Sequence, residues 1–497
     1  MTDLLLVTPP SRSMVYQNLS TNLAAIEPPV WSGLIANFMR RKGFDVRMLD
    51  AEAEGLDYVR TAQKITDTNA LLTVFVIYGQ QPSASTQCMP GGRKVGEELN
   101  RLQFDGATMV MGTHSSSLPE RTLREEPYTY VCEGEGPYTV LGLVEHLKGK
   151  RIIEDVPGLW YARDGVPHGN KAAPLIEDLD AELPGQAWDM LDMTRYRAHN
   201  WHCFEDLPSR PQYASLQTSL GCPFKCNFCC INAPFGKSSI RCWGVENVLS
   251  QIDTLVNTYG VKNIKIPDEM FVLNPKRVTS ICDGIIERGY KVNFWAYARV
   301  DTINDEVMLQ KLKKAGFNWL GMGIESASKY VRDGVTKGRF GNMDIIEAVR
   351  RVQDNGIYIA ANYIFGLPDD TKASMRETLV LAKELNTEWA NFYSAMAYPG
   401  SQLYPLAKTK GWPLPDDAGG PGWIGYSQHS FDCMPLPTET LTGQQVLDFR
   451  DAAFTDYFTG SDYQAMISRR FEPEVLHDIQ GMLSHDLPRR HGQRAAA

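Results

Sequence analysis

Several features that mark other classes of protein are missing from this chain of 497 residues. No apolar run approaches the roughly 20 residues that a membrane-spanning helix needs. Residues 1–7, MTDLLLV, are short and acidic, so they do not predict a signal peptide. The formal net charge of −9 gives no general basic field for nucleic acid or an anionic membrane. We therefore expect a cytoplasmic protein without a nucleic-acid or membrane partner.

The ten cysteines also lack the patterns of the commonest cysteine sites. Their spacing shows no disulfide framework, which favours a reducing compartment. No second C-x-x-C pair and no H-x-x-x-H follows the densest cysteine stretch, which disfavours a zinc knuckle with four ligands. His199, His202 and Cys203 have no further ligand group nearby. We expect these three side chains to pack in the interior, and Cys433 to be passive.

What the chain does contain is a short loop with three cysteines in the spacing C-x-x-x-C-x-x-C, namely Cys222, Cys226 and Cys229. Three thiolates on a loop with glycine and proline can hold three irons of a cubic four-iron cluster. The fourth iron then has no protein ligand and can bind a substrate-like molecule. Cys230 lies outside this spacing, and we expect it to be a small buried hydrophobic residue.

The first part of the chain, residues 1–149, alternates apolar strands with amphipathic helices. We expect strands at 4–8, 46–49, 71–78, 108–111 and 128–132, and a helix at about 93–102. This alternation predicts a doubly wound parallel sheet, in which ligands bind beyond the carboxyl ends of the strands. The candidate contacts in those loops are Thr8, Pro9, Glu52, Tyr78, Gly79, Gly112, Thr113, His114, Gly134 and Glu135.

The rest of the chain divides into three further regions. Residues 150–211 are interpreted as a connector with a small hairpin around the turn at 164–165. Residues 212–411 form a strand–helix repeat of six units, which predicts a partial barrel rather than a closed one of eight strands. Residues 412–497 are expected to be mostly helical and to cap the substrate pocket. Their basic, polar end from Arg489 onward is predicted to be disordered.

The six barrel strands are expected at 214–219, 263–266, 292–300, 319–325, 358–367 and 389–397. In barrels of this kind the chemistry lies at the carboxyl ends of the strands. The cysteine loop directly follows the first strand, so it lies where this rule places an active site. Asp268, Glu269, Arg299 and Glu325 lie at the ends of the next three strands. The alternative interpretation is that each of these four residues is an ordinary loop charge with a salt-bridge partner.

The stretch at 221–230, GCPFKCNFCC, resembles the cluster loop of the radical S-adenosylmethionine (SAM) enzymes. The resemblance implies that Cys222, Cys226 and Cys229 bind a four-iron four-sulfur cluster. It also implies that SAM chelates the fourth iron and that Phe228 lies by the adenine.

The strand ends also resemble the SAM-contacting edge of that family. By this resemblance Asp268 or Glu269 would meet the SAM ammonium. Arg299 could pair with its carboxylate. Glu325 could take the ribose hydroxyls or the ammonium.

The first domain, placed directly before such a core, resembles the cobalamin-binding domain of cobalamin-dependent radical SAM enzymes. Its loop at 133–136, EGEG, matches their usual G-E-x-x turn. Many cobalamin domains carry D-x-H-x-x-G, but residues 50–55 read DAEAEG, with Glu52 in place of the histidine. We therefore expect cobalamin with no histidine on its lower face. His114 could approach the ring or be a hydrogen-bonded loop residue. Alternatively, the sheet is vestigial and only packs on the core.

Together the resemblances imply a cobalamin-dependent radical SAM enzyme whose cofactors are the cluster, SAM and cobalamin. Family chemistry implies that a 5′-deoxyadenosyl radical removes a substrate hydrogen and that methylcobalamin supplies a methyl group. We expect methylation of an unactivated carbon, or of phosphorus, in a small molecule. A flavodoxin or ferredoxin type of protein would supply single electrons.

Other functions remain open on the sequence alone. A cobalamin-dependent radical SAM oxidoreductase or cyclase would use the same parts without transferring methyl. A non-catalytic iron–sulfur electron-transfer protein would never cleave SAM. An RNA-methylthiolating enzyme is disfavoured, because neither a second cysteine triad nor an RNA-binding tail is visible.

Overall fold

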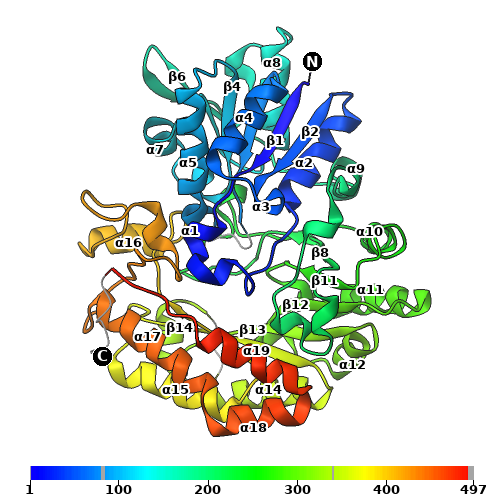
Figure 1. The fold of residues 1–497 in the computed structure, drawn as a ribbon, viewed down its shortest axis with the longest axis vertical. Helices are drawn as coiled ribbons and strands as arrows, with labels where there is room; N and C mark the ends of the chain where they lie inside the picture. The colour runs from blue at the N-terminus through cyan, green and yellow to red at the C-terminus, as the bar shows by residue number, and fades with distance from the viewer. Residues whose placement is uncertain (1, 80–83, 338–340, 491–497) are drawn as a thin grey trace.

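The computed structural model describes residues 2–79, 84–337 and 341–490. Figure 1 shows the N-terminal sheet at the top, the barrel strands below it, and the C-terminal helices α17, α18 and α19 against the barrel. In the part of the chain that the model describes, no helix is long and apolar enough to cross a membrane.

The N-terminal sheet has the strand order β2-β1-β3-β4-β5-β6-β7. Its first five strands pair in parallel, which confirms the doubly wound sheet. The hairpin of the connector does not stand apart: β6 pairs antiparallel with β5 and extends the sheet. The strands are β1 Leu4–Thr8, β2 Val46–Asp50, β3 Leu72–Val76, β4 Ala107–Met111, β5 Tyr130–Cys132, β6 Leu159–Arg163 and β7 Val166–Gly169.

Helices cover this sheet because its central strands are apolar on both faces. All five residues of β3, LTVFV, are buried. The helices are α1 Arg12–Tyr16, α2 Val30–Arg41, α3 Ala51–Glu54, α4 Tyr58–Thr68, α5 Ala84–Arg101, α6 Thr113–Ser117, α7 Pro119–Glu125 and α8 Pro137–Leu147.

Helix α5 begins at Ala84, earlier than the predicted start near residue 93. Its Pro90 and two glycines resemble a helix break in the sequence. In the structure the glycines allow close packing, because a Cβ on Gly91 would lie 2.5 Å from the Pro10 carbonyl oxygen. Tertiary contact therefore overrides the local preference, and the first turn of α5 reaches the seam between the domains.

The barrel sheet is open, and its six strands follow one another in chain order as β8-β11-β12-β13-β14-β15. All neighbours pair in parallel, which confirms the partial barrel. The strands are β8 Tyr213–Ser215, β11 Asn263–Ile266, β12 Asn293–Arg299, β13 Phe317–Glu325, β14 Tyr358–Phe365 and β15 Trp389–Ser394. The helices are α10 Val245–Asn257, α11 Pro275–Arg288, α12 Glu306–Lys314, α13 Lys329–Gly334, α14 Asn342–Asp354 and α15 Lys372–Leu385.

The first barrel strand is shorter than predicted. It leaves the sheet after Ser215, and β9 Ser219–Leu220 pairs antiparallel with β10 Arg241–Cys242 instead. Thr218 and Ser219 are drawn away by hydrogen bonds to the carboxylate of Asp268. The cysteine loop therefore starts from a small hairpin above the barrel edge.

The C-terminal region contains α16 Leu403–Thr409, the 3-10 turn η10 Trp423–Tyr426, α17 Gly443–Phe458, α18 Ser461–Arg470 and α19 Pro473–Leu483. The prediction that disorder begins at Arg489 is wrong for its first two residues. Arg489 donates to Asp451 and to the Ser430 carbonyl, and Arg490 donates to Asp432. The rest of that segment, 491–497, lies outside the described residues.

The two α/β domains are joined by buried ion pairs. Lys265 on β11 reaches Glu27 of the first domain with an N–O distance of 2.8 Å, and their side chains are 3% and 9% exposed. Arg241 on β10 pairs with Glu135 in the loop after β5. Removing one partner of such a pair leaves a buried charge, so these contacts fix the seam between the domains.

Candidate active site at the domain seam

The three cysteines of the C-x-x-x-C-x-x-C loop line a cavity of about 1580 Å³ at the carboxyl ends of the barrel strands. Asn232 closes the loop: its side chain accepts from Cys222 N at 3.1 Å and donates to Cys222 O at 2.9 Å. Gly221 has φ +85°, and a Cβ there would lie 2.4 Å from the Ser239 carbonyl oxygen, so this turn requires glycine.

None of the three thiols forms a disulfide among the described residues, and Cys230 is buried beside them as expected. Burial raises the pKa of Cys222 to about 11 and that of Cys229 well above its usual value, so ligation would have to displace protons. Among the described residues, no group of three or more Cys, His, Asp or Glu converges on a single-ion position. In a four-iron cluster each of three thiolates binds a different iron.

His202 and Cys203 pack in the interior as predicted, whereas His199 is half-buried and lines the large cavity. His202 Nε2 lies 3.1 Å from the Asn293 carbonyl oxygen, and Cys203 Sγ lies 3.4 Å from Asn263 Oδ1. Burial lowers the pKa of His202 to about 3, so this histidine is neutral.

Arg299 lies beside the cysteine loop, but the chain itself occupies its guanidinium. Two nitrogens donate to Asp301 at 2.9 and 3.0 Å, a further bond goes to the Lys337 carbonyl, and the group stacks 3.9 Å from the Phe224 ring centre. Nη1 lies 3.6 Å from Cys226 Sγ. Asp301 therefore takes the Nε–Nη2 side of the guanidinium, while Nη1 stands next to a thiol of the loop, and a contact with a SAM carboxylate stays a prediction.

The adjacent carboxylates Asp268 and Glu269 have different surroundings. Asp268 accepts from Thr218 N at 2.7 Å, Thr218 Oγ1 at 2.5 Å and Ser219 Oγ at 2.7 Å, and it does not line the cavity. Glu269 lines the cavity, and burial raises its pKa to about 7 while Lys265 and Lys337 lower it. Of the two alternatives, the geometry therefore favours Glu269 for an ammonium contact and gives Asp268 a bracing role.

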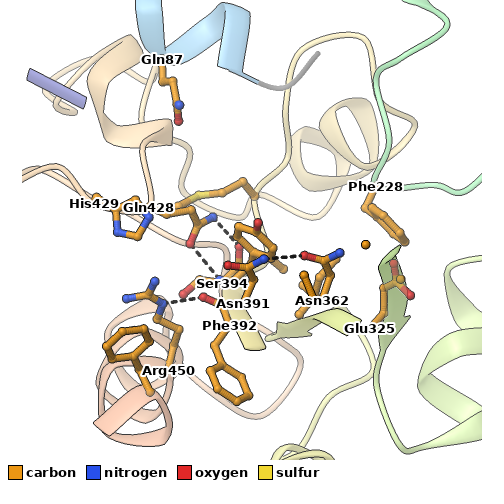
Figure 2. Close-up of a pocket in the computed structure, with 18 of the residues that line it drawn as sticks. Gln87, Phe228, Glu325, Asn362, Asn391, Phe392, Ser394, Gln428, His429 and Arg450 are labelled. Atoms are coloured by element: carbon orange, nitrogen blue, oxygen red, sulfur yellow. Dashed lines mark hydrogen bonds between the residues drawn. The ribbon is translucent and has the colours of Figure 1, made fainter. Parts of the chain in front are cut away.

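Glu325 ends β13 in the left-handed region, with φ +63°, where the pairing with β14 shifts register. A non-glycine residue in this conformation carries strain that its surroundings must hold. Lys337 helps to fix Glu325 in this conformation through a buried ion pair with an N–O distance of 2.8 Å. The other carboxylate oxygen, Oε2, is buried without a partner among the described residues. Figure 2 shows Glu325 on the same side of the pocket as Phe228.

A second cavity, of about 170 Å³, lies between the strand ends of the N-terminal sheet and the barrel. Of the residues predicted in those loops, it is lined by Thr8, Pro9, Glu52, Tyr78, Gly79 and Thr113. The two cavities adjoin, since Tyr16, Gln87, Ile231, Glu269 and Tyr297 line both.

Buried polar atoms that have no hydrogen-bond partner among the described residues gather around this second cavity. They are Thr8 Oγ1, Arg12 Nη1, Ser32 Oγ, Tyr78 Oη and Ser215 Oγ, and all five residues line it. An orphaned buried polar group costs about 1–3 kcal/mol, so a site with several of them is built for a missing polar ligand.

Two family models match the chain: the radical SAM superfamily over residues 216–382 and the B12 binding domain over residues 18–144. An uncharacterized methyltransferase of Pyrococcus horikoshii is 30% identical over 405 residues, which are 81% of this chain and 83% of that protein. The chain belongs to the cobalamin-dependent radical SAM enzymes.

Other members of this family are similar over most of the chain. The anaerobic magnesium-protoporphyrin IX monomethyl ester cyclase of Rubrivivax gelatinosus is 27% identical over 396 residues, 78% of this chain and 68% of that one. The cobalamin-dependent radical enzyme OxsB matches with a TM-score of 0.72 and 16% identity, covering 97% of this chain and 70% of that one. The methyltransferase TsrM from Kitasatospora setae matches with a TM-score of 0.68 and 16% identity, covering 97% and 100%. At these identities the two structures show the shared fold.

The cofactors of this cobalamin-dependent radical SAM enzyme are the four-iron four-sulfur cluster, SAM and cobalamin. The orphaned polar atoms of the second cavity suit the amide groups that surround a corrin ring. At about 170 Å³ this cavity is smaller than a site for a drug-sized ligand, so the ring would also need the shared part of the large cavity.

Glu52, which replaces the expected histidine, is committed to the chain. Its carboxylate accepts from Ser11 N and from Arg12 N, and Arg12 Nε lies 3.5 Å away. Burial raises the pKa of Glu52 despite these donors.

His114 does not line either cavity. Its Nδ1 lies 3.3 Å from Thr86 Oγ1, and its ring packs edge-on against Trp423 with centres 4.4 Å apart. This agrees with the alternative of a hydrogen-bonded loop histidine.

The structure also keeps Gly112, Gly134 and Glu135 off the two cavities. A Cβ on Gly112 would lie 2.1 Å from the Ile77 carbonyl oxygen, and Gly134 binds Ser116. Glu135 accepts from Ile176 N at 3.0 Å and pairs with Arg241. These three residues brace the loops whose neighbours line the site.

Sequence reasoning missed a chain of amides inside the barrel. Trp389 Nε1, which can only donate, is 2.9 Å from Asn391 Oδ1, and Asn391 Nδ2 donates to Asn362 Oδ1 at 3.0 Å. The Asn362 nitrogen is thereby left as a donor to the cavity, and Figure 2 shows it on the side of Phe228 and Glu325. The inward alternation of β14 and β15 could have indicated these positions.

Proposed function

We propose that this enzyme transfers a methyl group to an unactivated carbon, or to phosphorus, of a small molecule. The observation that carries the proposal is the pair of adjoining cavities at the seam. Residues of both domains, among them Tyr16, Gln87 and Glu269, line both cavities, so one small molecule can contact both cofactor regions. The Pyrococcus horikoshii relative is named a methyltransferase, which supports this reading.

When bound, the cofactors supply a 5′-deoxyadenosyl radical that removes a substrate hydrogen and a methyl group carried on cobalamin. Cys222, Cys226 and Cys229 would hold the cluster. Glu269 and Glu325 would bind the ammonium and the ribose of SAM.

The protein residues position the substrate and exclude water. Asn362 would offer its fixed donor to an oxygen of SAM or substrate. The C-terminal region would help to exclude water, because Met482, Leu483 and residues 485–490 line the large cavity.

A one-electron protein of the flavodoxin or ferredoxin type would reduce the cluster, and a reducing cytoplasm would preserve it. The Rubrivivax relative, a cyclase, supports a second candidate: a cobalamin-dependent oxidoreductase or cyclase without methyl transfer.

The test is anaerobic reconstitution followed by incubation with methyl-labelled SAM, hydroxocobalamin, a reductant and an extract of small molecules, so that every methyl group on cobalamin comes from labelled SAM. We expect deoxyadenosine and a labelled small-molecule product. Deoxyadenosine with an unlabelled product would favour the cyclase class. If the cluster is reduced but SAM is not cleaved in any condition, the protein would be interpreted as a non-catalytic electron carrier. Cys226→Ala is the control, because it removes one cluster ligand and should abolish SAM cleavage.

A further inference from the structure

Two arginines share one carboxylate on the wall of the large cavity opposite the cysteine loop. Arg450, on α17, donates through Nε to the Phe392 carbonyl at 2.7 Å and through Nη1 to Asp451 at 2.6 Å. Arg489, from the end of the described chain, donates twice to the same Asp451 at 3.1 Å and once to the Ser430 carbonyl at 2.9 Å. Both arginine side chains are only 5% exposed.

This sharing of one carboxylate distinguishes the two arginines from the other buried cations of the cavity. Lys265 pairs with Glu27, Arg299 with Asp301 and Lys337 with Glu325, each with a carboxylate of its own.

Asp448, on the same helix as Arg450, accepts from Gln444 at 2.7 Å, and Asp486 is exposed to solvent. Asp448 and Asp486 keep their negative charges, but neither forms an ion pair with Arg450 or Arg489 among the described residues, so Arg450 is a buried positive charge without a carboxylate of its own. Burying such a charge is costly unless an anion completes the site.

Two neutral polar atoms without a partner stand at the same wall. Ser394 is 2% exposed, and neither its Oγ nor His429 Nδ1 has a hydrogen-bond partner among the described residues, although both residues line the cavity. Gln428 fixes this corner by bonding the Ser394 backbone in both directions, at 2.9 and 2.8 Å. Figure 2 shows the Arg450 guanidinium on the side of His429, with Ser394 and Gln428 beside them.

His429 adds a donor rather than a second charge. Burial, together with Arg450 and Arg489, holds the pKa of His429 well below its usual value, so its ring is neutral. Its ring also stacks on Tyr16 of the first domain, 5.6 Å between centres, which links this wall to the seam.

We propose that this wall is the subsite for an oxyanion of the substrate, a carboxylate or a phosphate ester. Arg450 supplies the charge, Ser394 and His429 supply hydrogen bonds, and Arg489 is a positioning residue that neutralises Asp451. The inference rests on the proposed function, because it assigns the substrate's polar end to the cavity in which the chemistry would occur. The rest of the molecule would extend from this wall toward the seam.

The test measures anion binding to the reconstituted holoenzyme by calorimetry, with inorganic phosphate and acetate as probes and chloride at matched ionic strength. The measurement needs neither the substrate nor turnover. Anion binding can therefore be absent in an enzyme that transfers methyl, and it can be present in one that does not. We expect saturable binding of phosphate or acetate, and the tighter of the two identifies the source of the oxyanion. Arg450→Gln should weaken it at least tenfold, and Ser394→Ala severalfold.

Two further variants separate an anion subsite from a clasp that only holds the C-terminal segment. Arg489→Gln leaves Asp451 wholly to Arg450, so it should also weaken anion binding at least tenfold. Lys383→Gln is the control: Lys383 ties α15 to Asp456 on α17 and does not line the cavity, so its loss should leave binding unchanged.

The absence of saturable anion binding to the wild type would overturn the proposal, as would full retention in Arg450→Gln or an equal loss in Lys383→Gln. If Arg450→Gln does not fold, Ser394→Ala and Arg489→Gln decide the question, because unchanged affinity in both would equally overturn it.

Discussion

Neighbouring carboxylates at the end of β11 offer a sharp test of the site, because the structure gives them opposite roles. Glu269 faces both cavities, whereas Asp268 is saturated by three donors from Thr218 and Ser219. We predict that Glu269→Gln weakens SAM binding with little loss of stability. Asp268→Asn should instead lower stability, with a smaller effect on SAM.

The magnitudes follow from the contacts. A hydrogen bond to a charged group contributes about 1.5–3 kcal/mol, so losing the carboxylate of Glu269 should weaken SAM binding by about tenfold to 150-fold. In Asp268→Asn the new amide nitrogen meets a donor, and at least one of the three buried donors loses its acceptor. That loss should cost about 1–3 kcal/mol of folding free energy.

The assays are calorimetric titration of SAM into the reconstituted protein and urea denaturation followed by tryptophan fluorescence. Glu287→Gln, an exposed carboxylate on α11, is the control and should change neither quantity. If Asp268→Asn abolished SAM binding at unchanged stability while Glu269→Gln bound normally, the assignment of the two roles would be refuted.

Three further predictions concern the same seam. Burial raises the pKa of Glu269 to about 7, so SAM affinity should increase between about pH 6 and pH 8 in the wild type and stay constant with pH in Glu269→Gln. The contribution of Glu269 to stability should fall as the pH rises from about 4.5 to 7, because the folded state holds the proton more tightly than the unfolded state. A wild-type SAM affinity that does not change with pH would contradict this prediction. Tyr78→Phe should weaken cobalamin retention severalfold on desalting, whereas Tyr161→Phe, another buried hydroxyl without a partner but on β6, should not. Trp389→Phe removes the donor that orients the Asn391–Asn362 amides, so the amount of deoxyadenosine formed per molecule of product should increase severalfold. An unchanged ratio would argue against a role for this chain of amides.

Much of the architecture was predictable because its signals are local. Strand β11 has the predicted bounds, Asn263–Ile266, and the cysteine spacing of 222–229 points to cluster chemistry without any structure. The errors arose where distant contacts override local preference. Helix α5 passes through Pro90 because its glycines pack on the Pro10 backbone, and Arg489 is ordered because Asp451 accepts its donors.

The roles within the site depended on direction, which sequence spacing does not encode. Asp268 and Glu269 are adjacent, but the chain turns so that only Glu269 faces the cavities. Arg299 was expected to bind a carboxylate of SAM, yet it is held by Asp301 from two residues further along the chain. Lys337 gave no signal in the sequence, because its partner Glu325 lies on a different element.

By itself the sequence determined the order of the domains, the parallel sheets and the cluster loop, because strand periodicity and cysteine spacing are properties of short segments. Only the tertiary structure decided which charges remain unpaired. A buried ion pair such as Lys265–Glu27 joins residues far apart in the chain, and burial and partners, rather than residue type, decide whether a charge braces the fold or faces a ligand.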